Sequence, residues 1–275
     1  MEDCNGCATP CTTKLPEISN ESEPDKRIPY EALVGSLLWI SLGTRGDICY
    51  SVHQLSKYVK CYNNEMWTFG KRVLRYLKQT MNKSLTFSSN PNSTNSELIG
   101  YSDSSFADDK SDRRSTYGYC IYYNQNCISW SSKKMDSVAL STCETEFVSV
   151  VKLAQEAIYL QQLINELFPN SIQHFKIYCD NKSAISLANN STDHGRSKHI
   201  DIKYHFIREL IKKKTLQLEY IDSENQTADI FTKGLNREKL NRHRLQLKIE
   251  GDDVCLAGGV LSLQDKQLKQ DSHFT

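Results

Sequence analysis

Four acidic residues stand where predicted secondary-structure elements begin or end. The run Glu97–Asp103 has the pattern of a short buried strand that ends in Asp103, and Asp180 ends a second β-prone run. Glu146 lies in the first turns of a long amphipathic helix, and Asp229 lies at the start of a last helix. Carboxylates on such elements can converge on one point, and Mg²⁺ binds oxygen ligands of this kind. We therefore expect these acids to form a site for divalent cations.

Such a cluster would be suited to phosphoryl transfer. Two ions about 4 Å apart can activate a water and stabilise the leaving oxygen of an in-line displacement. Without metal the like charges repel, so we expect at least one carboxyl to have a raised pKa. Two of these acids also have ordinary alternatives, since Asp180 could cap the next helix and Glu146 could be a solvated helix-start acid. Ser141 and Glu144 fit a capping box, which would leave Glu146 to point into a cleft.

The elements that carry these acids follow the order βββαβααβα. The first strand lies near residues 98–103, and two β-rich runs at 117–123 and 126–131 are joined at Asn124 and Gln125, which suggests a hairpin. This order predicts a mixed sheet with helices packed on it, in an α/β or α+β architecture.

Composition divides the chain into five segments. They are a disordered polar tail at 1–27, a small helical module at 28–87, a linker at 88–97, the main domain at 98–235 and a C-terminal tail at 236–275. Cys4, Cys7 and Cys11 could alternatively form a weak or shared metal site, although a closed zinc site needs a fourth ligand that is absent nearby. In the helical module we expect Asp47 to cap the second helix.

The overall composition is that of a soluble globular protein of 275 residues with a net charge of +1. We expect no membrane association, because no apolar run approaches the roughly 20 residues of a membrane span. The first residues lack the features of a signal peptide, and ten cysteines in such a chain indicate reduced thiols in the cytosol or nucleus. The weak net charge means that any nucleic-acid surface must be local.

A series of sequence runs carries a family resemblance. The runs are Tyr-Ser-Asp (101–103), Asp-Arg-Arg-Ser-Thr-Tyr-Gly-Tyr (112–119), Ile-Ser-Trp-Ser-Ser-Lys-Lys (128–134), Ala-Leu-Ser-Thr-Cys-Glu-Thr-Glu-Phe (139–147), Ile-Tyr-Cys-Asp-Asn-Lys-Ser-Ala-Ile (177–185), Ser-Lys-His-Ile-Asp-Ile-Lys-Tyr-His-Phe-Ile-Arg-Glu (197–209) and Ala-Asp-Ile-Phe-Thr-Lys (228–233). Together they resemble the ribonuclease H domain of copia-type long-terminal-repeat retrotransposon Pol polyproteins. Residues 29–37, 43–48 and 71–78 resemble the thumb and connection segment of the same polyproteins.

The resemblance implies a ribonuclease H-like fold, with a five-stranded mixed sheet that has helices on both faces. It also implies an endoribonuclease that cuts the RNA strand of RNA–DNA hybrids with two Mg²⁺ or Mn²⁺ ions. By position, the four metal-binding acids of the family correspond to Asp103, Glu146, Asp180 and Asp229. The polymerase palm has no counterpart in this sequence, so we expect a Pol fragment whose partners are a hybrid and possibly a palm from another chain.

Two departures from the family pattern stand out. Cellular ribonucleases H have a mobile histidine before the fourth acid, whereas residues 221–228 contain none, and His199 and His205 are expected to be structural. Gly46 also stands where the family usually has proline.

A ribonuclease H must recognise its heteroduplex by shape and by 2′-hydroxyl groups. The candidate nucleic-acid contacts are Lys71, Arg72, Arg75, Lys133, Lys134, Asn181, Ser183 and Lys198. The basic helical face could instead be an ordinary solvated surface, and Asn181 and Ser183 could only cap a helix. The alternative function is an inactive or co-opted retrotransposon remnant that binds nucleic acid.

Overall fold

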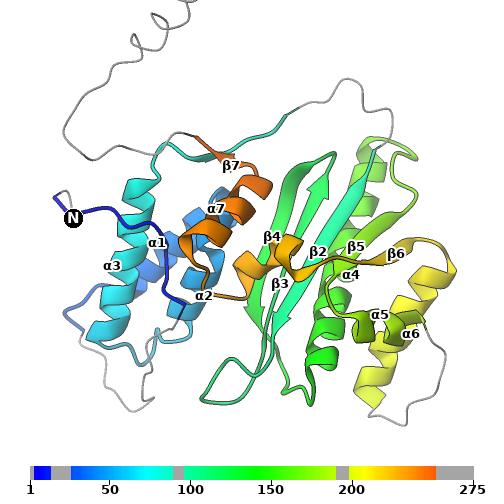
Figure 1. Cartoon of the computed structure of the whole chain (residues 1–275), viewed down its shortest axis with the longest axis horizontal. Coiled ribbons are helices and arrows are strands. Elements are labelled where there is room, and N and C mark those ends of the chain that lie inside the picture. Colours follow the sequence, from blue (N-terminus) through cyan, green and yellow to red (C-terminus); the bar gives the residue numbers. More distant parts are fainter. Residues whose placement is uncertain (1–2, 14–25, 89–95, 190–197, 252–275) are drawn as a thin grey trace, which may run out of the picture.

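A five-stranded mixed sheet separates two layers of helices (Figure 1). At its centre, β2 (Leu98–Ser105) pairs antiparallel with β3 (Thr116–Tyr123) and parallel with β5 (Phe175–Cys179). The edge strands are β4 (Asn126–Lys134) next to β3 and β6 (Leu216–Tyr220) next to β5. The strand order is therefore β4-β3-β2-β5-β6, and it confirms the expected mixed sheet with helices on both faces.

The computed structural model describes residues 3–13, 26–88, 96–189 and 198–251, without the side chains of 198–201. Most of the expected linker, residues 89–95, lies outside this part of the chain. Within it, no helix combines the length and the apolar character that crossing a membrane requires.

The β3–β4 hairpin turns at the two expected residues. Asn124 has φ 49° and Gln125 has φ 67°, and positive φ at both central positions is the geometry of a type I′ turn. This turn matches the twist of the two strands, so the hairpin prediction is confirmed.

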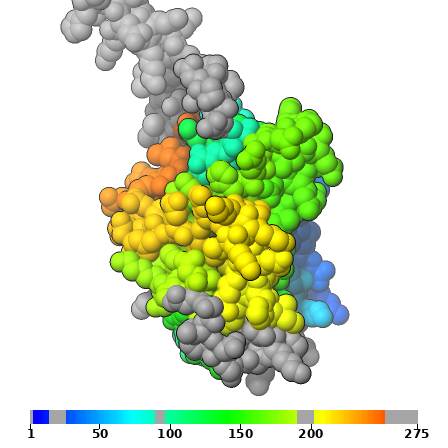
Figure 2. All heavy atoms as spheres, turned by 90° about the vertical axis from the view of Figure 1, so that its right-hand side faces the viewer, coloured from blue at the N-terminus to red at the C-terminus, as the bar shows by residue number. Residues whose placement is uncertain are grey.

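One face of the sheet is covered by α4 (Thr142–Leu167), α5 (Lys182–Asn189) and α6 (Lys198–Lys212). The core between them is fully apolar at its centre, where Ile121 and Ile177 of the sheet and Leu153 of α4 are inaccessible to solvent. Burial of each such side chain stabilises the fold by roughly 1.5–3 kcal/mol. At one edge of the sheet, α6 lies beside β6 (Figure 2).

The opposite face is covered by the helical module, which consists of α1 (Tyr30–Gly43), α2 (Cys49–Ser56) and α3 (Asn64–Gln79). Its buried side chains form one hydrophobic cluster with Cys120 and Tyr122 of β3. The Trp130 indole on β4 donates a hydrogen bond to the Ser41 carbonyl at 2.8 Å. The same ring lies against Gly46, where an added Cβ would be 3.1 Å from it, so a larger residue at 46 would push the ring away.

Both expected tails are shorter than predicted. The structure places α7 (Arg237–Gln246) and the short strand β7 (Ile249–Glu250) after the main domain, and β7 pairs with β1 (Ser84–Leu85). The physical reason is that Leu240, Leu247 and Ile249 are buried in the cluster of the helical module. Residues 252–275 lie outside the described part.

At the N-terminus, residues 3–13 pack along α3 instead of forming a free tail. The Cys7 N–H donates to the Arg75 carbonyl at 3.3 Å, and the Lys78 ammonium donates to the Cys4 carbonyl at 2.9 Å. Cys11 is buried in the hydrophobic cluster, and the described residues include no metal-ligand grouping of Cys4, Cys7 and Cys11.

The sequence predicted that Asp47 caps α2, and this prediction is wrong. Asp47 lies in the 3₁₀ helix η1 (Gly46–Ile48), where its carboxylate accepts two hydrogen bonds from Arg45 and one from the Tyr76 hydroxyl. A buried carboxylate needs such partners, and this need outweighs a role at a helix start.

Candidate metal centre

The structure brings the four predicted acids to one edge of the sheet. Asp103 lies on β2, Asp180 directly follows β5, and the parallel pairing of these strands aligns Ser102 with Cys179. Glu146 faces this edge from α4, and Asp229 comes from the 3₁₀ helix η3 (Thr227–Phe231). The carboxylates interact electrostatically, since the charges of Asp229 and Asp180 act on Asp103, and those of Asp103 and Asp180 act on Glu146.

A glycine allows η3 to reach Asp103. Gly118 of β3 is the register partner of Asp103, and a Cβ at this position would lie 2.5 Å from the Cβ of Phe231. Because glycine lacks this atom, η3 packs directly on the sheet. The close approach lets Thr232 donate a hydrogen bond from its hydroxyl to the Asp103 carboxylate.

Glu146 is held at one oxygen only. The backbone N–H and the hydroxyl of Ser104 donate to its Oε1 at 3.2 and 2.8 Å. Its Oε2 is buried and has no hydrogen-bond partner, and the residue as a whole is only 4% exposed. An unpaired buried carboxylate oxygen carries a large desolvation cost, so its position fits a bound cation.

The start of α4 explains why Glu146 points into the cluster. The Ser141 hydroxyl accepts the Glu144 N–H at 3.2 Å, and the Leu140 N–H donates to the Glu144 carboxylate at 2.8 Å. Glu144 is thus engaged in capping the helix, as the sequence predicted, and Glu146 is not.

Asp180 is likewise left available by its neighbour. The Asn181 side chain accepts the Ala184 N–H at 3.0 Å and so caps α5. Asp180 accepts a hydrogen bond from the hydroxyl of Ser223, in the 3₁₀ helix η2 (Ser223–Asn225), at 2.7 Å.

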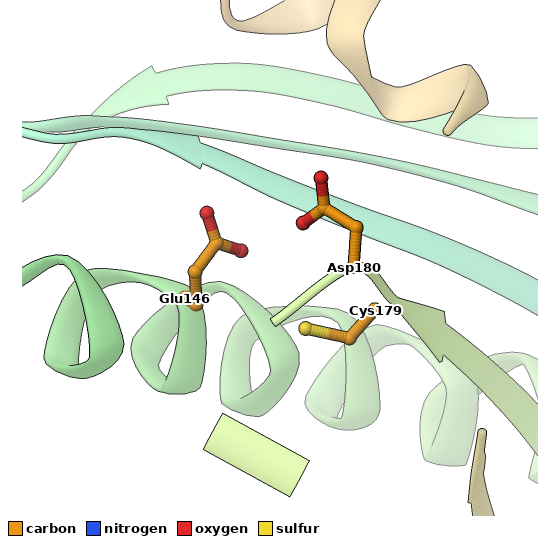
Figure 3. Close-up of side chains that lie close together, drawn as sticks. All are labelled: Glu146, Cys179 and Asp180. Carbon is orange, nitrogen blue, oxygen red and sulfur yellow. The ribbon is translucent and has the colours of Figure 1, made fainter. Parts of the chain in front are cut away.

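Figure 3 shows the carboxylates of Glu146 and Asp180 on facing elements, with the thiol of Cys179 beside them. Ligand atoms of these three residues all lie within 4.8 Å of one another. Sequence reasoning did not include Cys179 in the site.

Lys233 is a second residue that the sequence argument missed. Its ammonium lies 2.8 Å from Asp229 Oδ1 and 3.3 Å from Asp103 Oδ2. Its place four residues after Asp229 was a usable signal, since oppositely charged residues at this spacing meet on one helical face. Burial lowers the pKa of Lys233, but Asp103 and Asp229 outweigh that effect and raise the pKa above its ordinary value.

The electrostatics of the cluster follow from burial and from like charge. Burial raises the pKa of Asp103 to about 7, and Asp229 and Asp180 add to this effect, while Lys233 and Thr232 oppose it. Burial and the neighbouring Asp103 raise the pKa of Glu146 well above its ordinary value. The sequence predicted at least one carboxyl with a raised pKa, and the structure has two, Asp103 and Glu146. A divalent cation would stabilise the charged form of both carboxyls.

Several candidate nucleic-acid contacts already have partners within the chain. The Lys134 ammonium lies 2.6 Å from Asp109 and 2.8 Å from Asp112. Arg72 and Arg75 donate to the N-terminal segment, at Thr9 and at the Asn5 carbonyl.

The remaining candidates differ in exposure. Lys133 and Ser183 are exposed, Lys71 is half-buried with its ammonium over the Trp67 ring, and the Lys198 side chain lies outside the described part.

In comparisons with known proteins, no protein-family model matches the chain. It is 35% identical over 229 residues to the retrovirus-related Pol polyprotein from transposon TNT 1-94 of Nicotiana tabacum, which covers 83% of this chain and 17% of that protein. The chain belongs to the copia-type Pol polyprotein family. It spans only about a sixth of the length of such a relative.

Two further proteins are similar to parts of the chain. The chain is 38% identical over 135 residues to secreted RxLR effector protein 161 of Plasmopara viticola, covering 49% of this chain and 93% of that protein. Ribonuclease H1 from the archaeon Halobacterium salinarum matches 53% of this chain and 98% of its own, with a TM-score of 0.38 and 10% identity. The strand order β4-β3-β2-β5-β6 agrees with the five-stranded mixed sheet that the family resemblance implied.

Proposed function

We propose that the chain is a metal-dependent endoribonuclease that cuts the RNA strand of RNA–DNA hybrids. In this proposal two Mg²⁺ or Mn²⁺ ions are held by Asp103, Glu146, Asp180 and Asp229. The observation that carries it is the buried, unpaired Oε2 of Glu146, which lies in a cluster of carboxylates from four separate elements. A cluster with this much uncompensated charge is costly without a cation.

The donor set fits hard divalent ions. Carboxylate oxygens suit Mg²⁺ and Mn²⁺ better than softer metals. When bound, such ions activate a water and stabilise the leaving oxygen of the phosphodiester. The chain's own residues orient the ligands, because Ser104 fixes Glu146, Ser223 fixes Asp180 and Thr232 fixes Asp103.

Substrate recognition is proposed to depend on shape and on the 2′-hydroxyl groups of the RNA strand. Among the basic candidates, Lys133 is the exposed residue at the end of β4, so it is the first choice for a phosphate contact. Lys134, Arg72 and Arg75 would have to leave intramolecular partners to bind a phosphate.

One observation supports the alternative function. The similarity to an effector protein covers 93% of that protein, whose name is not that of a Pol polyprotein. A chain of this family could therefore act outside a Pol polyprotein, as a co-opted remnant that binds nucleic acid without cutting it.

The deciding experiment measures cleavage of an end-labelled RNA–DNA hybrid by the purified chain, with Mg²⁺ and separately with Mn²⁺. We expect cleavage of the RNA strand only, and we expect Asp103→Asn to reduce the rate roughly a thousandfold. Glu97→Gln is the matched control, because Glu97 immediately precedes the same strand at its opposite end and is 56% exposed. If the wild-type chain binds the hybrid but cuts it with neither metal, the alternative function is correct.

A further inference from the structure

The Lys233 ammonium lies between two of the proposed metal ligands. The Lys233 N–H donates to the Asp229 carbonyl at 3.1 Å, and this turn brings the two side chains to the same side of the backbone. The ammonium then reaches both Asp229 at 2.8 Å and Asp103 at 3.3 Å. It therefore bridges two carboxylates that come from distant parts of the sequence.

The exposure of the three side chains shows from which side the lysine enters. Asp103 and Asp229 are 2% and 7% exposed, whereas the Lys233 side chain is 41% exposed. The ammonium thus closes the solvent side of the Asp103–Asp229 pair, and its flexible stem has room to move outwards.

The rest of the cluster lacks such a counter-charge among the described residues. Within the described part of the chain, Lys233 forms ion pairs with Asp103 and Asp229, whereas Glu146 keeps an unpaired buried oxygen and Asp180 accepts a hydrogen bond from a neutral hydroxyl. One half of the cluster is therefore neutralised within the chain, and the other half is not.

We propose that Lys233 is a resident counter-cation that a divalent ion must displace from Asp103 and Asp229. This inference rests on the proposed metal site. Lys233 holds the two aspartates together in the metal-free protein and, by the same contacts, lowers the affinity for metal. It is a positioning residue, because it acts through the carboxylates.

The proposal predicts two opposite effects of Lys233→Met. The melting temperature of the EDTA-treated protein should fall by about 3 °C, because two buried carboxylates lose their partner. The dissociation constant for Mn²⁺ should fall about tenfold, because the competing ammonium is gone. Lys233→Arg keeps the charge and should bind Mn²⁺ no more tightly than the wild type.

The measurements are differential scanning calorimetry without metal and isothermal titration calorimetry with Mn²⁺. Lys213→Met is the matched control, because Lys213 forms a similarly short ion pair with Glu209 at 2.7 Å and precedes Leu216, the first residue of β6, at the other end of the strand from the residue that pairs with Cys179. We expect this control to leave the Mn²⁺ affinity unchanged. Where Lys233→Met does not fold, Lys233→Gln tests the same loss of charge.

The outcomes separate this inference from the proposed function. Lower stability with an unchanged Mn²⁺ affinity, in a wild-type chain that cuts hybrids, would overturn the role of Lys233 alone. Tighter Mn²⁺ binding by Lys233→Met, in a chain that cuts no hybrid, would support this role and contradict the nuclease. If neither the wild type nor Lys233→Met binds Mn²⁺, both proposals fail.

Discussion

Two buried clusters of charge, one around Asp47 and one around Asp103, differ in how completely they are neutralised. In the helical module, Asp47 accepts two hydrogen bonds from Arg45 at 2.8 and 2.9 Å and one from Tyr76 at 2.6 Å. Arg45 also donates to the hydroxyl and carbonyl of Thr80. Every charge in this network has a partner of opposite charge or a hydrogen bond.

The cluster at the sheet edge has the reverse character. Only Asp103 and Asp229 form ion pairs with Lys233 among the described residues, and the Oε2 of Glu146 has no partner. Burial of charge is tolerated when it is paired, as around Asp47, and is costly when it is not. The comparison teaches that the first cluster stabilises the fold, whereas the second gives up stability in a way that suits a cation-binding site.

The largest effect on stability is expected at the neutralised cluster. Asp47→Asn would leave the Arg45 guanidinium buried without its counter-charge, and we expect a loss of about 3–5 kcal/mol in the free energy of unfolding. Urea denaturation measures this loss. Glu219→Gln is the control, because Glu219 is exposed, lies 3.7 Å from Lys176, and should change stability by less than about 1 kcal/mol. Equal effects of the two variants would remove the distinction between the clusters.

Divalent metal should stabilise the other cluster. At a Mn²⁺ concentration about 100 times the dissociation constant, the gain should be about 2.7 kcal/mol, because only the folded state presents the assembled ligands. Calorimetry with and without EDTA measures the gain. Glu146→Gln should abolish most of it, because the unpaired carboxylate oxygen is lost. A full Mn²⁺ gain in the Glu146→Gln variant would show that the metal binds elsewhere.

The metal-free protein should lose stability as the pH rises. The pKa of Asp103 is about 7 in the folded state, above the ordinary value of 3.8, so the folded state keeps a proton that the unfolded chain releases. The contribution of Asp103 to stability is then complete below about pH 4 and falls by about 1.4 kcal/mol per pH unit towards pH 7. Thermal unfolding in EDTA at several pH values tests the slope. Asp103→Asn should flatten it, and a wild-type curve that rises from pH 5 to pH 7 would contradict this account of the cluster.

The smallest effect is expected at two adjacent lysines. Like the two clusters, they differ in whether their charge is neutralised within the chain. Lys133 is exposed, whereas Lys134 is paired with Asp109 and Asp112. We expect Lys133→Ala to reduce the slope of log affinity against log salt for hybrid binding by about 1, and Lys134→Ala to leave it unchanged. Fluorescence anisotropy at several salt concentrations measures both slopes. A change of the slope in Lys134→Ala alone would reverse the assignment.

The fold could be predicted from the sequence where local patterns determine it. Alternating apolar residues marked the strands, turn residues marked the hairpin at Asn124, and Ser141 with Glu144 marked the start of α4. The same local patterns placed the four acids at element ends, so their convergence followed from the order of strands and helices. A parallel pair such as β2 and β5 aligns its carboxyl ends without further information.

The missed features depend on contacts between distant residues. Thr232 and Lys233 reach Asp103 across about 130 positions, and only the close packing of η3 on Gly118 brings them there. Asp47 was predicted to be a helix cap from its place before an apolar run. Its actual partner Tyr76 is 29 positions away, so local sequence could not reveal this contact. The segment that forms α7 is too polar to indicate a packed helix until Leu240 is seen to be buried.

The central claim is that Asp103, Glu146, Asp180 and Asp229 hold divalent ions in one pocket. The most direct test is a crystal of the chain soaked in Mn²⁺, with anomalous scattering recorded to locate the metal. We predict anomalous peaks within bonding distance of these carboxylates, including the Oε2 of Glu146. Mn²⁺ peaks confined to other parts of the molecule, with the Glu146 oxygen still unpaired, would contradict the account.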